Sequence, residues 1–307
     1  MSGDLKRFMA RGLCFAAVWL AMLAALNHFY VRTNGYKSLD CTFKFYLVPD
    51  GIQVANLGSS HGEYGLDYSG IRGVTGFNFA LSGQSLYSDL QVLEKFADRL
   101  AEGCTVIIPL SYFSFVQARD HNNQHVLYYR WLDYGSIQNR DPVEYVRFRL
   151  LPVINAGFNL KYLIRDKKAV EFHYIPSMLG DNVEEFRKYA RLHLQYCRDL
   201  MHEGGYEAFN RENLEGIIRL CLERGFRPVL ITTPYTRYYN ELFSQEFLDG
   251  FHATISDICH RYGLTYLDYS HDPRFAETLE WFVDSDHLND KGRKAFTEIL
   301  LKDLGVI

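Results

Sequence analysis

The chain is 307 residues long, which is enough for one large α/β domain or two smaller ones. Hydrophobic residues make up 48% of it and charged residues 23%, a balance typical of a globular protein that buries a sizeable core. The formal net charge of −4, without a basic stripe, argues against nucleic acid as the main partner.

The N-terminal region has the pattern of a membrane segment. Three basic residues, Lys6, Arg7 and Arg11, precede an almost uninterrupted apolar run over residues 12–31. Such a run is about long enough to cross a bilayer as a helix, and positive charge before it favours a cytoplasmic N-terminus, residues 1–11. We therefore predict a single-pass anchor at the cell membrane, with the bulk of the chain outside the cytoplasm.

Two other interpretations of the apolar run stay open. Small residues at Ala21, Ala24 and Ala25 are what a cleaved signal peptide would have near the end of its core. A buried helix of the folded domain is the second alternative, and the one-sided charge disfavours it. The run continues as far as Val31, longer than a usual signal core, and this length favours the anchor.

Beyond a linker, residues 32–49, short apolar strands alternate with helices. Strands are predicted over residues 51–57, 76–81, 104–110, 227–233 and 264–268, and helices over residues 85–100, 206–224 and 245–262. This alternation implies a mainly parallel sheet covered on both faces. We predict a three-layer α/β/α sandwich over residues 50–307, interrupted by a long insertion at residues 112–205.

Residues with catalytic chemistry follow the predicted strands. Ser60 comes after the first strand, Gly83 after the second and Ser111 after the third. Asp284 and His287 lie in the loop after the last strand. Reacting groups of parallel sheets gather at the carboxyl ends of the strands, so all five are expected at one edge. A serine with a distant aspartate and histidine is the residue set of a nucleophilic hydrolase or acyltransferase.

Each motif alone has a simpler interpretation. A Gly-Ser-Ser turn after a strand is commonly only a tight loop. Asp284 or Asp286 can simply cap the helix that follows. His61, which directly follows Ser60, is expected to be structural or to contact substrate rather than to act as the base, since neighbours on a sharp turn point apart.

The six cysteines show no close pairing and no Cys-x-x-Cys motif, so neither a disulfide framework nor a zinc site is expected. Cys104 and Cys221 stand in apolar periodic contexts and are expected to be small core residues. One disulfide among the other cysteines stays an alternative. The six cysteines of the chain are Cys14, Cys41, Cys104, Cys197, Cys221 and Cys259.

Taken together, the motifs resemble the SGNH/GDSL hydrolase superfamily from about residue 50 to the end, apart from the insertion. Gly-Ser-Ser at residues 58–60 stands where the family has Gly-Asp-Ser, and residues 78–83 match the second block through its glycine. Asp-Ser-Asp-His at residues 284–287 matches the final Asp-x-x-His. The third block departs from Gly-x-Asn-Asp, because residues 110–114 read Leu-Ser-Tyr-Phe-Ser and lack the oxyanion-hole asparagine.

The resemblance implies a serine enzyme that needs no metal or diffusible cofactor. Ser60 would be the nucleophile, His287 the base that takes its proton, and Asp284 the carboxylate that fixes the tautomer of the base. The amides of Ser60 and Gly83 would hold the oxyanion. A hydroxyl of Ser111 or of the neighbouring tyrosine would replace the missing asparagine.

The substrate is expected to contact residues around this edge. Tyr235 and Arg237 follow the fourth strand and are predicted to line the cleft with His61 and Tyr112. The insertion mixes aromatic and basic residues, which stack on sugars, hold acidic groups or lie at a membrane interface. A helical cap that packs its own core is an equal alternative.

The anchor and the Gly-Ser-Ser variant are similar to accessory proteins of membrane-bound O-acyltransferases, including the teichoic-acid D-alanylation proteins of the DltD type and the alginate and cellulose acetylation proteins. This similarity implies an acyltransferase or esterase that moves an acyl group, acetyl for example, on a cell-surface polysaccharide through an acyl-Ser60. A membrane-bound O-acyltransferase is the expected partner. The alternative is a non-catalytic binding or scaffold partner of that acyltransferase, which the missing asparagine keeps open.

Overall fold

The computed structural model describes residues 3–116, 125–168, 179–180, 182–202 and 206–307. The chain forms two compact units. Unit 1 comprises Met1–Leu47 and His125–Phe172, and unit 2 comprises Val48–Gln124 and His173–Ile307.

Unit 2 is built on a five-stranded, fully parallel sheet. Its strand order, β2-β1-β3-β4-β5, is the flavodoxin-like doubly wound order, whose topological switch point lies between β1 and β3. The strands are β1 (Ile52–Asn56), β2 (Gly76–Asn78), β3 (Leu100–Pro109), β4 (Arg227–Thr232) and β5 (Tyr266–Asp268). This architecture confirms the predicted α/β class with a mainly parallel sheet.

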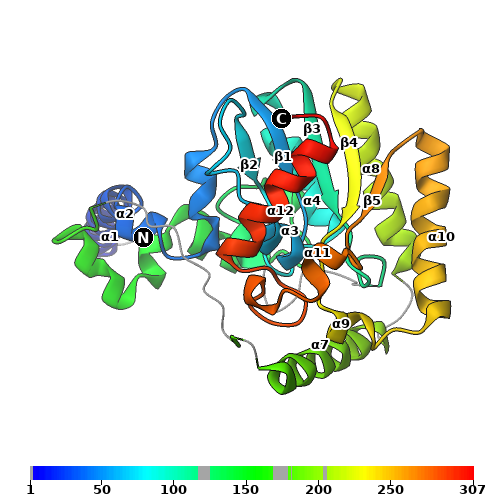
Figure 1. Ribbon diagram of the computed structural model, residues 1–307. Coiled ribbons are helices and arrows are strands. Elements are labelled where there is room, and N and C mark those ends of the chain that lie inside the picture. Colours follow the sequence, from blue (N-terminus) through cyan, green and yellow to red (C-terminus); the bar gives the residue numbers. More distant parts are fainter. Residues whose placement is uncertain (1–2, 117–124, 169–178, 181, 203–205) are drawn as a thin grey trace. The chain divides into compact units, whose positions relative to one another are not determined.

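Helices cover both faces of the sheet (Figure 1). α3 packs against α12 on one face, and α4 packs against α8 on the other. The helices of unit 2 are α3 (Ser60–Gly65), α4 (Leu86–Phe96), η2 (Ala97–Arg99), α7 (Val183–His202), α8 (Glu207–Glu223), α9 (Arg237–Asn240), α10 (Gln245–Tyr262), α11 (Pro273–Ala276), η7 (Leu279–Trp281) and α12 (Asp290–Asp303).

The helix ends follow from local sequence. Ser85 and Ser244 begin α4 and α10, because each side chain accepts a hydrogen bond from an amide of the first turn. Gly263 ends α10 with φ of 66°, in the left-handed region that glycine enters without strain. The apolar strand and helix faces bury a core between the sheet and α12, which includes Val54, Ile107, Ile231, Phe296 and Leu300.

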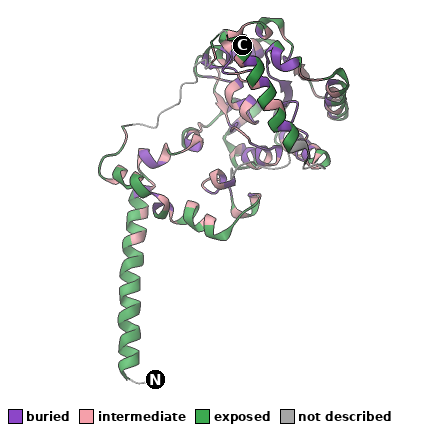
Figure 2. Ribbon diagram, turned by 90° about the horizontal axis from the view of Figure 1, so that it is seen from below, coloured by how far each residue is buried: buried purple, intermediate pink, exposed green. Residues whose placement is uncertain are grey.

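Unit 1 joins the N-terminal segment to part of the predicted insertion. Its first helix, α1, is long and apolar enough to cross a membrane, and it is exposed along most of its length (Figure 2). The elements of unit 1 are α1 (Gly3–Tyr30), α2 (Asn34–Lys37), η1 (Cys41–Leu47), α5 (His125–Tyr128), η3 (Tyr134–Ser136), α6 (Pro142–Tyr145), the π-helical turn η4 (Val146–Leu150), η5 (Pro152–Asn155) and η6 (Gly157–Leu163).

This division differs from the predicted one in two respects. The linker predicted over residues 32–49 is folded in part, because Asp40 pairs with Arg130 at 3.1 Å and the ring of Phe45 packs on Trp131. The predicted insertion is shared between the units, since residues 125–168 belong to unit 1 and α7 belongs to unit 2. The six cysteines all lie within the described residues, and none of them forms a disulfide.

Candidate active site

The turn after β1 presents Ser60 at the carboxyl edge of the sheet. Gly58 has φ of 114°, which a residue with a side chain rarely adopts, and an added Cβ there would approach the ring of Pro109 to 3.3 Å. The Gly58 amide donates to the buried carboxylate of Asp89 at 2.7 Å. The chain then enters α3, with Ser59 at its N-cap and Ser60 as its first residue.

Two asparagines at the strand ends fix this turn. Asn56, at the end of β1, donates through Nδ2 to Oδ1 of Asn78 at the end of β2, over 3.0 Å. The Nδ2 of Asn78 donates in turn to the carbonyls of Gly62 and Leu66, each at 2.9 Å. α3 is thus hydrogen-bonded to the ends of both β1 and β2, and these bonds fix the position of Ser60 at its first turn.

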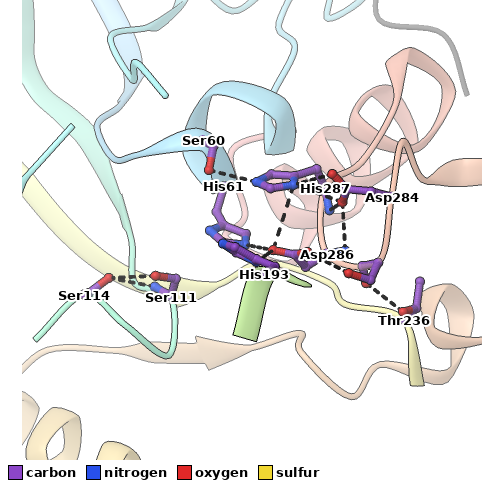
Figure 3. Close-up of polar contacts among 10 residues, drawn as sticks. Ser60, His61, Ser111, Ser114, His193, Thr236, Asp284, Asp286 and His287 are labelled. Atoms are coloured by element: carbon purple, nitrogen blue, oxygen red, sulfur yellow. Dashed lines mark hydrogen bonds and ion pairs between the residues drawn. The ribbon is translucent and has the colours of Figure 1, made fainter. Parts of the chain in front are cut away.

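Ser60, His287 and Asp284 form a continuous hydrogen-bonded chain (Figure 3). The Oγ of Ser60 lies 2.8 Å from Nε2 of His287. The Nδ1 of His287 lies 3.0 Å from both carboxylate oxygens of Asp284. This is the order of contacts in which a carboxylate orients an imidazole and the imidazole accepts the proton of a serine.

The loop that carries Asp284 and His287 is held by its own hydrogen bonds. Asp284 Oδ1 accepts the backbone amides of Asp286 and His287, at 3.1 and 3.0 Å. Directly afterwards, Asn289 caps α12 by accepting two amides of its first turn. Asp284 therefore shapes the turn and meets the imidazole with the same carboxylate; the helix cap itself is Asn289 rather than an aspartate.

The site changes the proton affinity of His287. Burial lowers the pKa of this imidazole, but the carboxylates of Asp284 and Asp286 outweigh burial and raise the pKa to about 8. A pKa of about 8 means that the protonated imidazole predominates at neutral pH.

A second charge network lies behind the imidazole of His287. The buried Asp286 contacts two histidines through Oδ2: Nε2 of His61 at 2.9 Å, and Nδ1 of His193 at 2.8 Å in an ion pair. Its Oδ1 accepts the hydroxyl of Ser285 at 2.9 Å. The same Oδ2 is 3.9 Å from Nδ1 of His287, and the rings of His61 and His287 stack with centroids 4.8 Å apart.

The three groups of this network carry defined charges. Burial raises the pKa of Asp286, but the neighbouring histidines hold it well below its ordinary value, so the carboxylate is ionised. Burial lowers the pKa of His193, yet Asp286 raises it to about 11, and this imidazole is protonated. Burial lowers the pKa of His61 below its ordinary value, so that ring is neutral.

Sequence reasoning considered Asp286 only as a helix cap and did not single out His193. The signal for Asp286 was its place beside His287, inside the Asp-x-x-His motif. His193 gives no comparable signal, because it lies within the 20-residue helix α7, far from the other site residues in sequence.

The loop after β2, which contains Gly83, contacts the turn that contains Ser60. The amide of Leu81 donates to the carbonyl of Gly58 at 3.2 Å, and Ser82 donates from its amide and its hydroxyl to Glu63 of α3, each at 2.6 Å. Gly83 has φ of 75°, a conformation that favours glycine. These contacts hold the loop that carries Gly83 beside the Ser60 turn.

The two predicted replacements for the missing asparagine are turned elsewhere. The hydroxyl of Ser111 contacts the hydroxyl of Ser114 at 3.3 Å, and Figure 3 draws this pair apart from the triad. The hydroxyl of Tyr112 donates to Asn240 at 2.9 Å from within a buried aromatic cluster. Both hydroxyls therefore have partners within the protein, Ser114 for Ser111 and Asn240 for Tyr112, and a contact of either with an oxyanion stays a prediction.

The predicted substrate contacts are also revised. His61 and Tyr235 are buried, with their rings 5.2 Å apart, and Tyr235 in turn packs on Tyr112, so these three support the site from inside. They were expected at the cleft because each stands at or next to a strand end, where a side chain can turn to either side. Arg237 is exposed, pairs with Glu277 at 3.2 Å and lines a cavity of about 340 Å³.

Within the part of the chain that the structure describes, one group of side chains has donor atoms close enough for a metal ion. The ligand atoms of His61, Asp286 and His287 lie within 4.8 Å of one another. Both ring nitrogens of His287 are already engaged, by Ser60 and Asp284. A metal bound here would therefore displace the contact of His287 with Ser60 or with Asp284.

Fold and site together define an α/β protein in which serine, histidine and aspartate contact one another in the same sequence as in a serine hydrolase or acyltransferase. Among solved structures, one described as a platelet activating factor from Streptococcus pneumonia is similar at a TM-score of 0.42 and 12% identity, over 96% of this chain and 98% of that one. An acylhydrolase structure from Bacteroides fragilis gives 0.42 and 10%, over 88% and 97% of the two chains. A GDSL-like lipase structure from Parabacteroides merdae gives 0.37 and 11%, over 85% and 99%.

No protein-family model and no curated protein matches the chain. Because the identities and TM-scores are this low, we rest the functional conclusion on the geometry of the site.

Proposed function

We propose that the protein is a serine esterase or O-acyltransferase. The observation that carries this proposal is the hydrogen-bonded chain from Ser60 through His287 to Asp284. Neutral His287 takes the hydroxyl proton as Ser60 Oγ attacks the acyl carbonyl, and the new C–O bond gives a tetrahedral oxyanion. His287 then returns the proton to the leaving alcohol as its C–O bond breaks, which leaves an acyl-Ser60.

The second half of the reaction repeats the same steps with a new nucleophile. Water or a sugar hydroxyl gives its proton to His287 and attacks the acyl-Ser60, so water makes the enzyme an esterase and a sugar makes it a transferase. The amides of Ser60 and Gly83 are the proposed oxyanion donors. With Ser111 and Tyr112 engaged elsewhere, we expect weak hydrolysis of simple esters.

We further propose that α1 anchors the enzyme in the cell membrane, with unit 2 outside the cytoplasm. Lys6, Arg7 and Arg11 precede the apolar segment, which supports this orientation. The helix runs without a break through Ala25 to Tyr30, and Tyr30 is buried in unit 1, which supports an anchor over a cleaved leader. The proposed substrate is an O-acylated polysaccharide of the cell surface, and the proposed partner is a membrane-bound O-acyltransferase.

The decisive test uses the full chain in detergent or nanodiscs with a chromogenic acetyl ester, with and without a polysaccharide acceptor. Mass spectrometry should find an acyl group on Ser60 and, with the acceptor, acylated sugar. Ser60→Ala should remove both signals, while Ser59→Ala, one residue away, should keep them. An acyl-enzyme in wild type that persists in Ser60→Ala would disprove the assignment of the nucleophile.

A further inference from the structure

Unit 1 exposes large apolar side chains on three consecutive short helices, η4, η5 and η6, and on the residue that follows them. Phe158 is 97% exposed and Ile164 is 94% exposed, and more than half of Leu150 and Ile154 is also exposed. Single apolar residues are common on a protein surface, but a run of them at this exposure marks an interaction site.

This apolar segment is fastened to the end of α1. The side chain of Asn27 donates through Nδ2 to the carbonyl of Leu150 at 3.0 Å and accepts the amide of Val153 through Oδ1 at 3.1 Å. Tyr30, three residues further on, is buried against Val153 and Ala156. The position of η5 along the axis of α1 is therefore set by the last turn of that helix.

The length of α1 fixes where the segment lies if the helix crosses a bilayer. Its 28 residues extend over about 42 Å, whereas a hydrocarbon core of about 30 Å takes about 20 residues. The apolar run ends at Val31, so Asn27 lies within about one turn of the place where hydrocarbon meets headgroups. Leu150 and Val153, its hydrogen-bond partners, lie at the same level.

The charges of the same segment suit an anionic lipid surface. Arg147, Arg149, Lys161, Arg165 and Lys168 are exposed beside the apolar residues. The two acidic residues between positions 143 and 168 are engaged within unit 1. Asp166 accepts the amides of Asn34 and Gly35 at 2.7 Å, and Glu144 contacts His125 at 2.9 Å. Long basic side chains next to inserted apolar ones are the pattern of an interfacial membrane segment.

We infer that residues 146–164 form a membrane-interface collar around the exit of α1. Phe158 and Ile164 insert at the boundary between headgroups and acyl chains, and the basic side chains contact lipid phosphates. The inference rests on the proposed anchoring of α1 and goes beyond it, because a helix can span a bilayer while the fold it carries stands clear of the lipid.

Photo-crosslinking in the full chain tests the collar. Benzoylphenylalanine is placed at position 158 or 164, with position 222 as control, since Leu222 is an exposed apolar residue of α8 in unit 2. The protein is reconstituted in vesicles of phosphatidylcholine and phosphatidylglycerol and irradiated. We expect a phospholipid adduct at positions 158 and 164 in yield several-fold above position 222, and a lower yield when phosphatidylglycerol is left out.

The outcomes separate the collar from the anchor. In native membranes, adducts at position 158 to a second protein in place of lipid would overturn the collar and assign the surface to a membrane-protein partner. Lipid adducts no more frequent than at position 222 would also overturn it, provided that alkaline carbonate leaves the chain in the membrane. Release of the chain by carbonate would refute the anchor itself.

Discussion

Replacing His193 with glutamine should move the pH dependence of catalysis upward. The protonated His193 pairs with Asp286, and its ring centroid lies 5.8 Å from that of His287, the proposed base. Glutamine keeps a polar side chain at this position but removes the positive charge. Asp286 keeps the hydrogen bonds from His61 and Ser285, so its carboxylate stays ionised and acts on His287 without its counter-charge.

The size of the effect follows from these distances. A unit charge at 5.8 Å changes the free energy of protonation by about 3 kcal/mol at an effective dielectric constant of about 20, or about two pKa units, and the partial exposure of His193 reduces this toward one. The pKa of His287 should rise from about 8 to between about 9 and 10. The rate at pH 7 should then fall about 10- to 100-fold and recover at high pH.

Asp286→Asn supplies the matched change of opposite sign. This variant removes the carboxylate 3.9 Å from Nδ1 of His287, and His193 loses its proton along with its counter-ion. The lost carboxylate of Asp286 is nearer to His287 than the lost charge of His193, so its effect is larger. The pKa of His287 should therefore fall by about one unit.

The assay measures kcat/KM for a chromogenic ester between about pH 5 and about pH 10. The dependence of kcat/KM on pH reports the pKa values of groups in the free enzyme, including that of His287. Thermal unfolding of each variant serves as the control for folding. A structural role alone would lower the rate equally at every pH. Profiles of both variants that keep the wild-type midpoint would refute the electrostatic reasoning.

Three further outcomes are expected. Ser60→Ala should lower ester turnover by about 10⁴-fold or more without loss of thermal stability, with Ser59→Ala as the control, and retained turnover would reject the nucleophile. The raised pKa of His287 should contribute about 2 kcal/mol to the free energy of unfolding. This contribution is fully present below about pH 6.5 and is lost as pH rises through about 8. The free energies of unfolding of wild type and His287→Gln, measured by denaturant titration, should therefore converge above about pH 8. Ser111→Ala and Tyr112→Phe should change kcat by less than about threefold, because a transition-state contact would be worth at least about a hundredfold.

The parallel α/β sheet and the approach of Ser60, His287 and Asp284 to one another could be predicted, because both follow from local pattern and a general rule. The apolar strands are short and bounded by glycine or polar residues, and the doubly wound order places their carboxyl ends together. Tyr112 and Tyr235 could not be placed, since an aromatic residue at a strand end can turn toward the cleft or into the core. His193 and the pairing of Asp40 with Arg130 depend on contacts between distant segments, which no periodicity records.

The two carboxylates of the loop at residues 284–287 contact different histidines: Asp284 contacts His287, and Asp286 contacts His61 of α3 and His193 of α7. In the proposed enzyme, the acid-base groups and the charge that sets their pKa therefore come from separate parts of the chain. Substitutions on α7 near His193 would change the pKa of His287 while Ser60 and His287 stay unchanged. If Ser60 and His287 act as proposed, a displacement of α7 that separated His193 from Asp286 would lower the rate at neutral pH by raising the pKa of His287, without a steric block of the cleft.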